Sequence, residues 1–318
     1  MTYKVGVIGL GIMGQRMVQC MLPHPHFEVL VGWDIQRSTS EGVQRDLAPN
    51  MKIAADAQAL IADPALDLIY IASPPTSHLA YAQTAMNAGK AIFCEKPLAV
   101  HIEASRQMVT ELAKCGLPNA VNFPFAASQE VATLEKHIQE GRHGEAQLLE
   151  ISFHFSEWPR TWQRDAASWL SGRVEGGFLR EVFSHFVYLT QRIIGPLTIQ
   201  SAQLNFPADG ITAETYVMAN LESNGLPIRV SGGVGGAAPD YNAWTLFGSQ
   251  KSYRFYDWRL MQVADLEGWH ELVPEIEPKP LMGDQLDALA EMLTGNPHCL
   301  PDFAAALAVQ EIVEGLLQ

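Results

Sequence analysis

Residues 3–14 read YKVGVIGLGIMG, and this stretch decides the fold of the first third of the chain. An apolar run of strand character ends in the pattern G-x-G-x-x-G, and a helical pattern follows directly. In that context the glycines have separate roles: a tight turn, close approach of the backbone to a pyrophosphate, and packing of helix on strand. The helix N-terminus would hold the pyrophosphate through its N–H groups and dipole. A dinucleotide site is therefore predicted at Gly9, Gly11, Ile12, Met13 and Gly14.

The residues around this loop alternate short apolar runs with helical patterns as far as residue 123. Strands that are apolar throughout and separated by helices indicate a parallel sheet covered on both faces. The sequence thus predicts a dinucleotide-binding, doubly wound (Rossmann) α/β domain over residues 1–123. Its expected strands are residues 3–8, 27–33, 51–55, 67–72, 91–95 and 119–123, and its expected helices are residues 12–21, 78–88 and 102–114.

Asp34 closes the second strand, about 20 residues after the last glycine of the loop. A carboxylate there accepts hydrogen bonds from ribose hydroxyls and repels a 2′-phosphate, so NAD is the preferred cofactor. Arg37 and Ser38 follow closely, and they would hold a 2′-phosphate if they turned inward, so NADP stays open. An ordinary turn or N-cap aspartate is the other interpretation of Asp34.

After residue 124 the pattern changes to period-2 alternation, which is typical of a sheet with one face on a core and one partly exposed. We therefore expect an α+β domain over residues 124–318, with a large, mostly antiparallel open sheet that serves substrate binding and oligomerisation. An exposed apolar sheet face usually means association, so a homodimer or homotetramer through this sheet is predicted. The helices expected here are residues 128–140, 177–194, 282–294 and 302–317.

The composition excludes several classes of function. With 21 basic against 35 acidic side chains the formal net charge is −14, and such a field repels nucleic-acid backbones and anionic membranes. The four cysteines form no C-x-x-C pair, so neither a disulfide framework nor a zinc site is indicated, and a reduced, cytoplasmic location is expected. No apolar stretch reaches the roughly 20 residues of a membrane span, and no catalytic metal is predicted.

Residues 94–98, CEKPL, place a cation before a proline at the end of an apolar strand. The residue before a proline is held away from the α region, so Lys96 cannot continue into a helix. Ligands of doubly wound folds bind at the carboxyl ends of the strands, and the Lys96 ammonium is therefore expected to face the cofactor. A surface lysine paired with Glu95 is the alternative.

Five segments together resemble the Gfo/Idh/MocA oxidoreductases, a family that includes glucose-fructose oxidoreductase and inositol dehydrogenase. They occur in the family's order with similar spacing, and the resemblance covers nearly the whole chain. Its specific part is the EKP segment together with a later helix that carries Asp/Glu-x-x-x-His. The segments are GLGIMG (9–14), ASPPTSH (72–78), GKAIFCEKPL (89–98), EGRHGE (140–145) and EGGFLREVFSHFVYL (175–189).

The resemblance implies a catalytic set of Lys96, His185 and Glu181. In the family the lysine contacts the reacting hydroxyl, the histidine accepts its proton, and the acid before it orients substrate or histidine. Glu181 and His185 are four residues apart on an expected helix, so they share a face on independent grounds. The family usually has Asp at the position of Glu181, which leaves open whether this acid contacts substrate or only the imidazole. A buried structural histidine is the alternative for His185.

The resemblance also implies where the rest of the cofactor would bind, and that the bond before Pro97 is cis. His78 is expected near the nicotinamide, although helix capping or packing explains it equally well. The further cofactor contacts predicted are Arg37, Ser73, Pro74, His78, Glu95 and Lys96.

Residues 157–173 combine three tryptophans and three arginines just before the catalytic helix. Tryptophan faces stack on sugar rings, and arginines bind hydroxyls or a carboxylate. A clamp between domains or subunits is the alternative. Arg160, Trp162 and Arg164 are the predicted substrate contacts.

The expected function is NAD(P)-dependent hydride transfer with a secondary alcohol of a sugar, cyclitol or related polyol, a small-molecule substrate. One alternative is a reductase of a conjugated or imine-type substrate, similar to biliverdin reductase. Another is a non-catalytic NAD(H)-binding redox sensor. Retention of both Lys96 and His185 argues against the sensor, because binding NAD requires neither.

Overall fold

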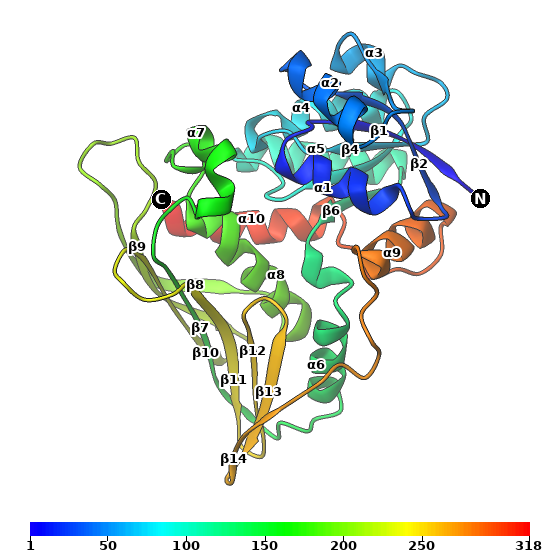
Figure 1. Ribbon diagram of the computed structural model, residues 1–318. Coiled ribbons are helices and arrows are strands. Elements are labelled where there is room, and N and C mark those ends of the chain that lie inside the picture. Colours follow the sequence, from blue (N-terminus) through cyan, green and yellow to red (C-terminus); the bar gives the residue numbers. More distant parts are fainter. The chain divides into compact units, whose positions relative to one another are not determined.

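The computed structural model describes residues 1–318, and the chain divides into two compact units (Figure 1). One unit consists of residues 1–127 and 279–310, and the other of residues 128–278 and 311–318. Residues 279–310, which the sequence pattern placed in the second domain, pack in the structure with the first unit. The helical pattern there carries no local feature that indicates its packing partner.

The first unit contains a six-stranded parallel sheet with the strand order β3-β2-β1-β4-β5-β6, which confirms the doubly wound prediction. The order reverses between β1 and β4, and ligands of such sheets bind outside the carboxyl ends of the strands at that point. Its strands are β1 (Tyr3–Ile8), β2 (Phe27–Trp33), β3 (Lys52–Ile53), β4 (Leu68–Ile71), β5 (Ala91–Glu95) and β6 (Asn119–Asn122). Its helices are α1 (Ile12–Met21), α2 (Arg37–Asp46), α3 (Ala57–Ile61), α4 (Pro75–Asn87), α5 (Ile102–Cys115), η1 (Pro124–Ala126) and α9 (Gly283–Thr294).

Two α-helices of this unit, α2 and α3, are absent from the sequence prediction. Helix α2 buries only Ser40 and Val43, so its sequence has no apolar stripe to reveal it. Helix α3 has five residues and starts at Asp56, whose carboxylate accepts a hydrogen bond from the Ala59 N–H. Such a short helix is too brief for a periodic pattern.

The second unit contains an eight-stranded sheet with the order β14-β13-β12-β11-β7-β10-β9-β8. All neighbouring pairs are antiparallel except β7 with β10, so the prediction of a mostly antiparallel sheet is confirmed. Its strands are β7 (Ala146–Phe155), β8 (Thr198–Asn205), β9 (Tyr216–Ser223), β10 (Leu226–Val234), β11 (Tyr241–Gly248), β12 (Ser252–Tyr256), β13 (Leu260–Asp265) and β14 (Gly268–Glu271). Its helices are α6 (Gln129–Gln139), η2 (Thr161–Ala166), α7 (Ala167–Leu170), η3 (Leu179–Phe183) and α8 (Ser184–Ile193), and α10 (Phe303–Leu317) begins in the first unit and ends in this one.

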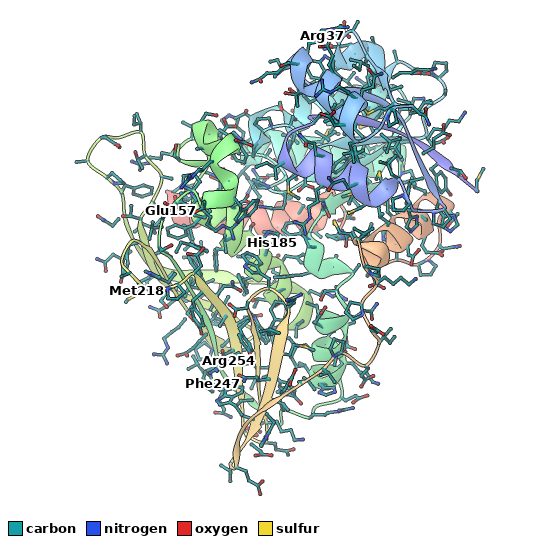
Figure 2. The ribbon with its side chains drawn as sticks, in the orientation of Figure 1. Arg37, Glu157, His185, Met218, Phe247 and Arg254 are labelled. Atoms are coloured by element: carbon teal, nitrogen blue, oxygen red, sulfur yellow. The ribbon has the colours of Figure 1, made fainter.

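One face of the eight-stranded sheet packs on helices (Figure 1), and the other face is partly exposed. The indole of Trp244 on β11 is fully buried and donates a hydrogen bond to Thr190 of α8, at 3.0 Å. On the opposite face Arg229 and Glu150 form an ion pair at 2.8 Å and are part of a row of polar side chains across the sheet. Figure 2 labels Met218, Phe247 and Arg254 on β9, β11 and β12.

Candidate active site

The glycine-rich turn joins β1 to α1, and each glycine has a distinct surrounding. A Cβ atom on Gly9, whose φ is +88°, would lie 2.6 Å from the backbone of Ala72. A Cβ on Gly14 would lie 2.0 Å from the Gly9 carbonyl oxygen, so this glycine lets the helix pack on the turn. By contrast, a Cβ on Gly11 would meet no atom within 4 Å. The open space at Gly11, next to the first-turn N–H groups of α1, fits a pyrophosphate.

Asp34 lies directly beside this turn. Its carboxylate accepts hydrogen bonds from the backbone N–H groups of Leu10, at 2.8 Å, and Gln36, at 2.9 Å. These bonds fix its orientation at the end of β2, where ribose hydroxyls of a dinucleotide would be bound. Arg37, the alternative phosphate ligand, is exposed and forms an ion pair with Glu41 at 2.9 Å. The arrangement fits NAD better than NADP.

His78 connects two loops at the carboxyl end of the sheet. The imidazole is 1% exposed, with Nδ1 2.9 Å from the Pro97 carbonyl oxygen and Nε2 2.7 Å from the Ser73 carbonyl oxygen. A neutral imidazole has one N–H, so both contacts are hydrogen bonds only when the ring is doubly protonated. Pro74 is the N-cap of α4, and the Ser73 hydroxyl lies 2.7 Å from that of Ser77.

Glu95 belongs to a buried network below the lysine corner. Its Oε1 accepts hydrogen bonds from the Tyr70 hydroxyl, at 2.5 Å, and from the Asn122 amide, at 2.7 Å. Gln285 of α9 donates to Asn122 at 2.9 Å, which connects the returning segment to β5. Burial and the nearby Glu95 carboxylate raise the pKa of Tyr70 well above its usual value. The Glu95 carboxylate therefore lies inside the unit, where it holds the end of β5.

Lys96 follows β5 directly and is half-buried. The peptide bond between Lys96 and Pro97 is cis, which confirms that expectation. The lysine thus lies at the carboxyl edge of the parallel sheet, on the same edge as the glycine-rich turn after β1.

Glu181 and His185 lie in the second unit on two different kinds of helix. The expected single helix over residues 177–194 consists of a π-helical turn, η3, followed by α8. Glu181 is in the π turn and His185 is the second residue of α8, 7% exposed. Short π turns occur often at functional sites.

The π turn is anchored by Glu214, which sequence reasoning missed. Its Oε1 accepts a hydrogen bond from the Leu179 N–H at 2.8 Å, across 35 residues of sequence. Gly177, with φ of +96°, makes room for it, because a Cβ there would lie 2.3 Å from Glu214 Oε2. That oxygen has no hydrogen-bond partner, and burial raises the pKa of Glu214 to about 7.

Glu214→Gln is expected to change how stability depends on pH. The folded-state pKa of about 7 lies above the ordinary 4.5, so the folded state holds this proton more tightly. The resulting stabilisation is complete below pH 4.5 and is lost as pH rises through 7, an effect of about 3 kcal/mol. Glutamine does not titrate but keeps an acceptor for the Leu179 N–H. The free energy of unfolding of the variant should therefore no longer fall as pH rises, as measured by urea unfolding from pH 4.5 to 8. Exposed Glu271→Gln is the control, and an unchanged decline in Glu214→Gln would contradict the assignment.

Arg160 lies within a cluster of aromatic rings and is coupled to Glu181 through Gln163. Arg160 Nε donates to Gln163 Oε1 at 3.0 Å, and Gln163 Nε2 donates to Glu181 Oε1 at 3.0 Å. Burial lowers the pKa of the guanidinium, whereas the charges of Glu181 and Asp240 act in the opposite direction. Its Cζ lies 5.4 Å from the ring centroid of Phe155, 5.8 Å from Trp158, 4.8 Å from Trp162 and 5.5 Å from Trp258.

Two of the three predicted substrate contacts, Arg160 and Trp162, lie together, and Arg164 lies apart from them. Trp162 stacks on Arg160 while remaining 53% exposed. The Arg164 side chain is 72% exposed and lies 3.9 Å from Glu157, outside the aromatic cluster. Figure 2 labels Glu157 and His185 in this unit.

Trp258 is the second residue that sequence reasoning missed. It lies in the turn between β12 and β13 with φ of 68°, after Asp257 with φ of 46°, and a bulky residue rarely adopts such a conformation. Buried Asn242 holds the turn by accepting hydrogen bonds from both N–H groups, each at 3.2 Å. The Trp258 ring packs edge-on against His185, with centroids 5.7 Å apart, and also contacts Phe186.

The sequence contains a weak signal for one of these residues. Only three residues, Asp257 to Arg259, separate the alternating strands SYRFY and LMQVAD, and such a short connection indicates a hairpin. Nothing in the sequence connects Glu214 to the catalytic helix. The only sequence signal for a role of Gln163 is its position between Arg160 and Arg164.

Across residues 1–318 no group of three His, Cys, Asp or Glu side chains is arranged to hold a metal ion. None of the helices is both long and apolar enough to cross a bilayer.

Two family models match this chain, one for each half. Residues 3–123 match the oxidoreductase family with the NAD-binding Rossmann fold, and residues 131–254 match the GFO/IDH/MocA C-terminal domain. The match to the first model makes residues 3–123 an NAD-binding domain, in agreement with the glycine turn and Asp34.

Individual relatives agree with the family models. An inositol 2-dehydrogenase of Pseudomonas savastanoi pv. phaseolicola is 36% identical over 151 residues, 47% of this chain and 45% of that protein. The chain thus matches about half of the length of this curated relative. The structure of levoglucosan dehydrogenase with NADH and levoglucosan has a TM-score of 0.84 at 21% identity, covering 99% of this chain and 96% of the other. A 3-ketoreductase of Actinomadura kijaniata with NADP has a TM-score of 0.85 at 18% identity, covering 99% and 97%.

At these identities the structural matches show a shared fold. The two family models, which together span most of the sequence, show family membership as well as fold. The chain belongs to the Gfo/Idh/MocA family of oxidoreductases.

Proposed function

We propose that this protein is an NAD-dependent dehydrogenase that acts on a secondary alcohol of a sugar, cyclitol or related polyol. The observation that carries the proposal is that a chain with an intact dinucleotide site also has both Lys96 and His185. Binding NAD requires neither side chain, whereas oxidation of an alcohol requires a proton acceptor and a group that stabilises the oxygen.

The proposed roles follow from the chemistry of the side chains. His185 takes the hydroxyl proton, and Lys96 stabilises the oxygen as its negative charge develops, an interaction stronger in the transition state than in the ground state. NAD, which the glycine-rich turn and Asp34 would hold, would supply the acceptor for the hydride of the alcohol carbon. The Glu181 carboxylate binds hydroxyl groups of the substrate. The hydrogen bond that Glu181 accepts from Gln163 supports the orientation of this carboxylate.

A screen for NAD reduction over monosaccharides, inositols and sugar acids tests this function. Turnover with at least one of these alcohols is expected. Absence of turnover despite tight NADH binding would favour a redox sensor. Oxidation of NADH by a conjugated or imine-type substrate alone would favour the reductase.

Asp34 should give NADH the tighter binding of the two reduced cofactors. A lost hydrogen bond to a charged group costs about 1.5–3 kcal/mol, so Asp34→Ala is expected to weaken NADH binding by roughly 10- to 100-fold. The same change removes the repulsion between the Asp34 carboxylate and a 2′-phosphate, so the affinities for NADH and NADPH should become more similar. Fluorescence titration of both cofactors measures this, with Arg37→Ala as the control that leaves NADH binding unchanged. Tighter binding of NADPH by the unaltered protein would contradict the preference.

We also propose a homodimer or homotetramer formed through the open face of the eight-stranded sheet. The exposed side chains of Met218 and Tyr241 on that face support it, because exposed apolar groups favour association. Sedimentation velocity tests this, and a species of monomer mass alone would refute it. The proposed location is the cytoplasm, since all four cysteines are free thiols, and cell fractionation checks it.

A further inference from the structure

We propose that Arg160 binds a carboxylate of the substrate, so that the preferred substrates are sugar acids rather than neutral sugars. The inference rests on the proposed function, because it names the substrate class of the same site. It concerns only residues of the second unit.

The guanidinium of Arg160 is held in place, but most of its hydrogen-bond donors have no partner within the protein. Its Nε donates to Gln163 at 3.0 Å, and four aromatic rings surround its Cζ at 4.8 to 5.8 Å. Its two Nη groups, which carry four N–H donors, make no hydrogen bond within the chain. A planar guanidinium fixed in this way presents the paired donors that match a carboxylate in two parallel hydrogen bonds.

Arg180, in the same unit, is an arginine with a structural role and can be compared with Arg160. Its Nε and Nη2 donate to both oxygens of Glu314, at 2.6 and 2.8 Å. Its Nη1 donates to the carbonyl oxygens of Arg173 and Gly176, at 2.9 and 3.0 Å. An arginine that only clamps the fold uses its donors internally, as Arg180 does, and Arg160 does not.

Arg160 is also close to the proposed proton acceptor. The ring of Trp258 is 5.5 Å from Arg160 Cζ and 5.7 Å from the His185 ring centroid, so both residues contact one indole. A substrate that places its hydroxyl at His185 would reach Arg160 with a group a few bonds away. The neighbouring tryptophans offer apolar faces for the C–H surface of a sugar ring.

The surrounding charges favour a carboxylate over a phosphate. Glu181 and Asp240 both act on Arg160 electrostatically, so two acids already lie near one guanidinium. These acids repel a singly charged carboxylate less than a phosphate monoester, which carries nearly two negative charges. The preferred ligand is therefore a monoanion.

The test uses matched pairs of compounds that differ in the carboxylate. D-glucuronate is compared with D-glucose, and D-galacturonate with D-galactose, with D-glucose 6-phosphate as the phosphate arm. Binding to the NADH-loaded protein is followed by tryptophan fluorescence, and NAD reduction is followed separately. The variants are Arg160→Gln, Arg160→Lys and, as a matched control, Arg173→Gln, which removes an exposed arginine stacked on Phe206 at 4.0 Å.

We expect the unaltered protein to bind at least one acid 10-fold or more tightly than its neutral partner. Arg160→Gln should weaken binding of that acid by 10- to 100-fold and leave the neutral sugar nearly unchanged, with lysine in between and Arg173→Gln without effect. Equal binding within both pairs, or tighter binding of the phosphate, would overturn the proposal. So would a preference for acids that survives in folded Arg160→Lys and Arg160→Gln. Because binding is measured without turnover, a lack of NAD reduction would count against the proposed function and not against the carboxylate site.

Discussion

Replacing His185 with alanine is expected to lower kcat by about 10²- to 10⁴-fold, the usual contribution of a positioned general base. Binding of NADH should stay nearly unchanged, because the glycine-rich turn and Asp34 lie in the other unit. Steady-state kinetics with the best substrate of the NAD-reduction screen, combined with NADH titration, separates the two effects. A fall in kcat without a change in cofactor affinity assigns the histidine to the chemical step.

Two controls guard this result against a loss of folding. His185 is 7% exposed and packs on Trp258, so alanine leaves space, whereas His185→Gln keeps much of the volume without a base of suitable pKa. His270→Ala removes an exposed histidine of β14 and should have no kinetic effect. Turnover by both His185 variants at the original rate would remove this residue from the mechanism.

The parts of the fold that could be predicted from the sequence are those that depend on local sequence patterns. The strand at residues 3–8, the turn at Gly9 and the carboxylate at Asp34 are each recognisable within a few residues of chain, because turn sterics and strand burial act locally. The two sheets and their strand directions followed from run length and alternation. These signals were sufficient for the fold class and for the cofactor.

The parts that the sequence could not predict depend on contacts between distant residues. The π turn that carries Glu181 is held by Glu214, and no local pattern distinguishes it from an α-helix. Trp258 occupies a left-handed position that turn preferences would assign to Asn or Gly, and Asn242 of the neighbouring strand holds it there. Residues 279–310 join the first unit through side chains such as Gln285, whose partner is far away in sequence.

Glu314→Ala should cause the largest loss of stability among simple substitutions in the second unit. Glu314 and Arg180 form a nearly buried, doubly hydrogen-bonded pair, with side chains 11% and 8% exposed. Removing one partner of such a pair leaves a buried charge uncompensated and costs about 3–5 kcal/mol. The surface pair of Arg229 and Glu150 is the control, because Glu150→Ala at an exposed site should cost no more than about 1 kcal/mol.

The double variant Arg180→Met/Glu314→Leu shows whether charge or packing is responsible. Apolar residues of similar volume often replace a buried ion pair without loss, so the pair of changes should recover most of the stability that Glu314→Ala loses. The activity should not recover, because Arg180 also donates to the carbonyl oxygens of Arg173 and Gly176, which lead into the π turn. Urea unfolding and kcat of the same samples measure the two quantities. Recovery of both would mean that the ion pair stabilises the unit without positioning Glu181, and loss of both would mean that the fold requires this arginine.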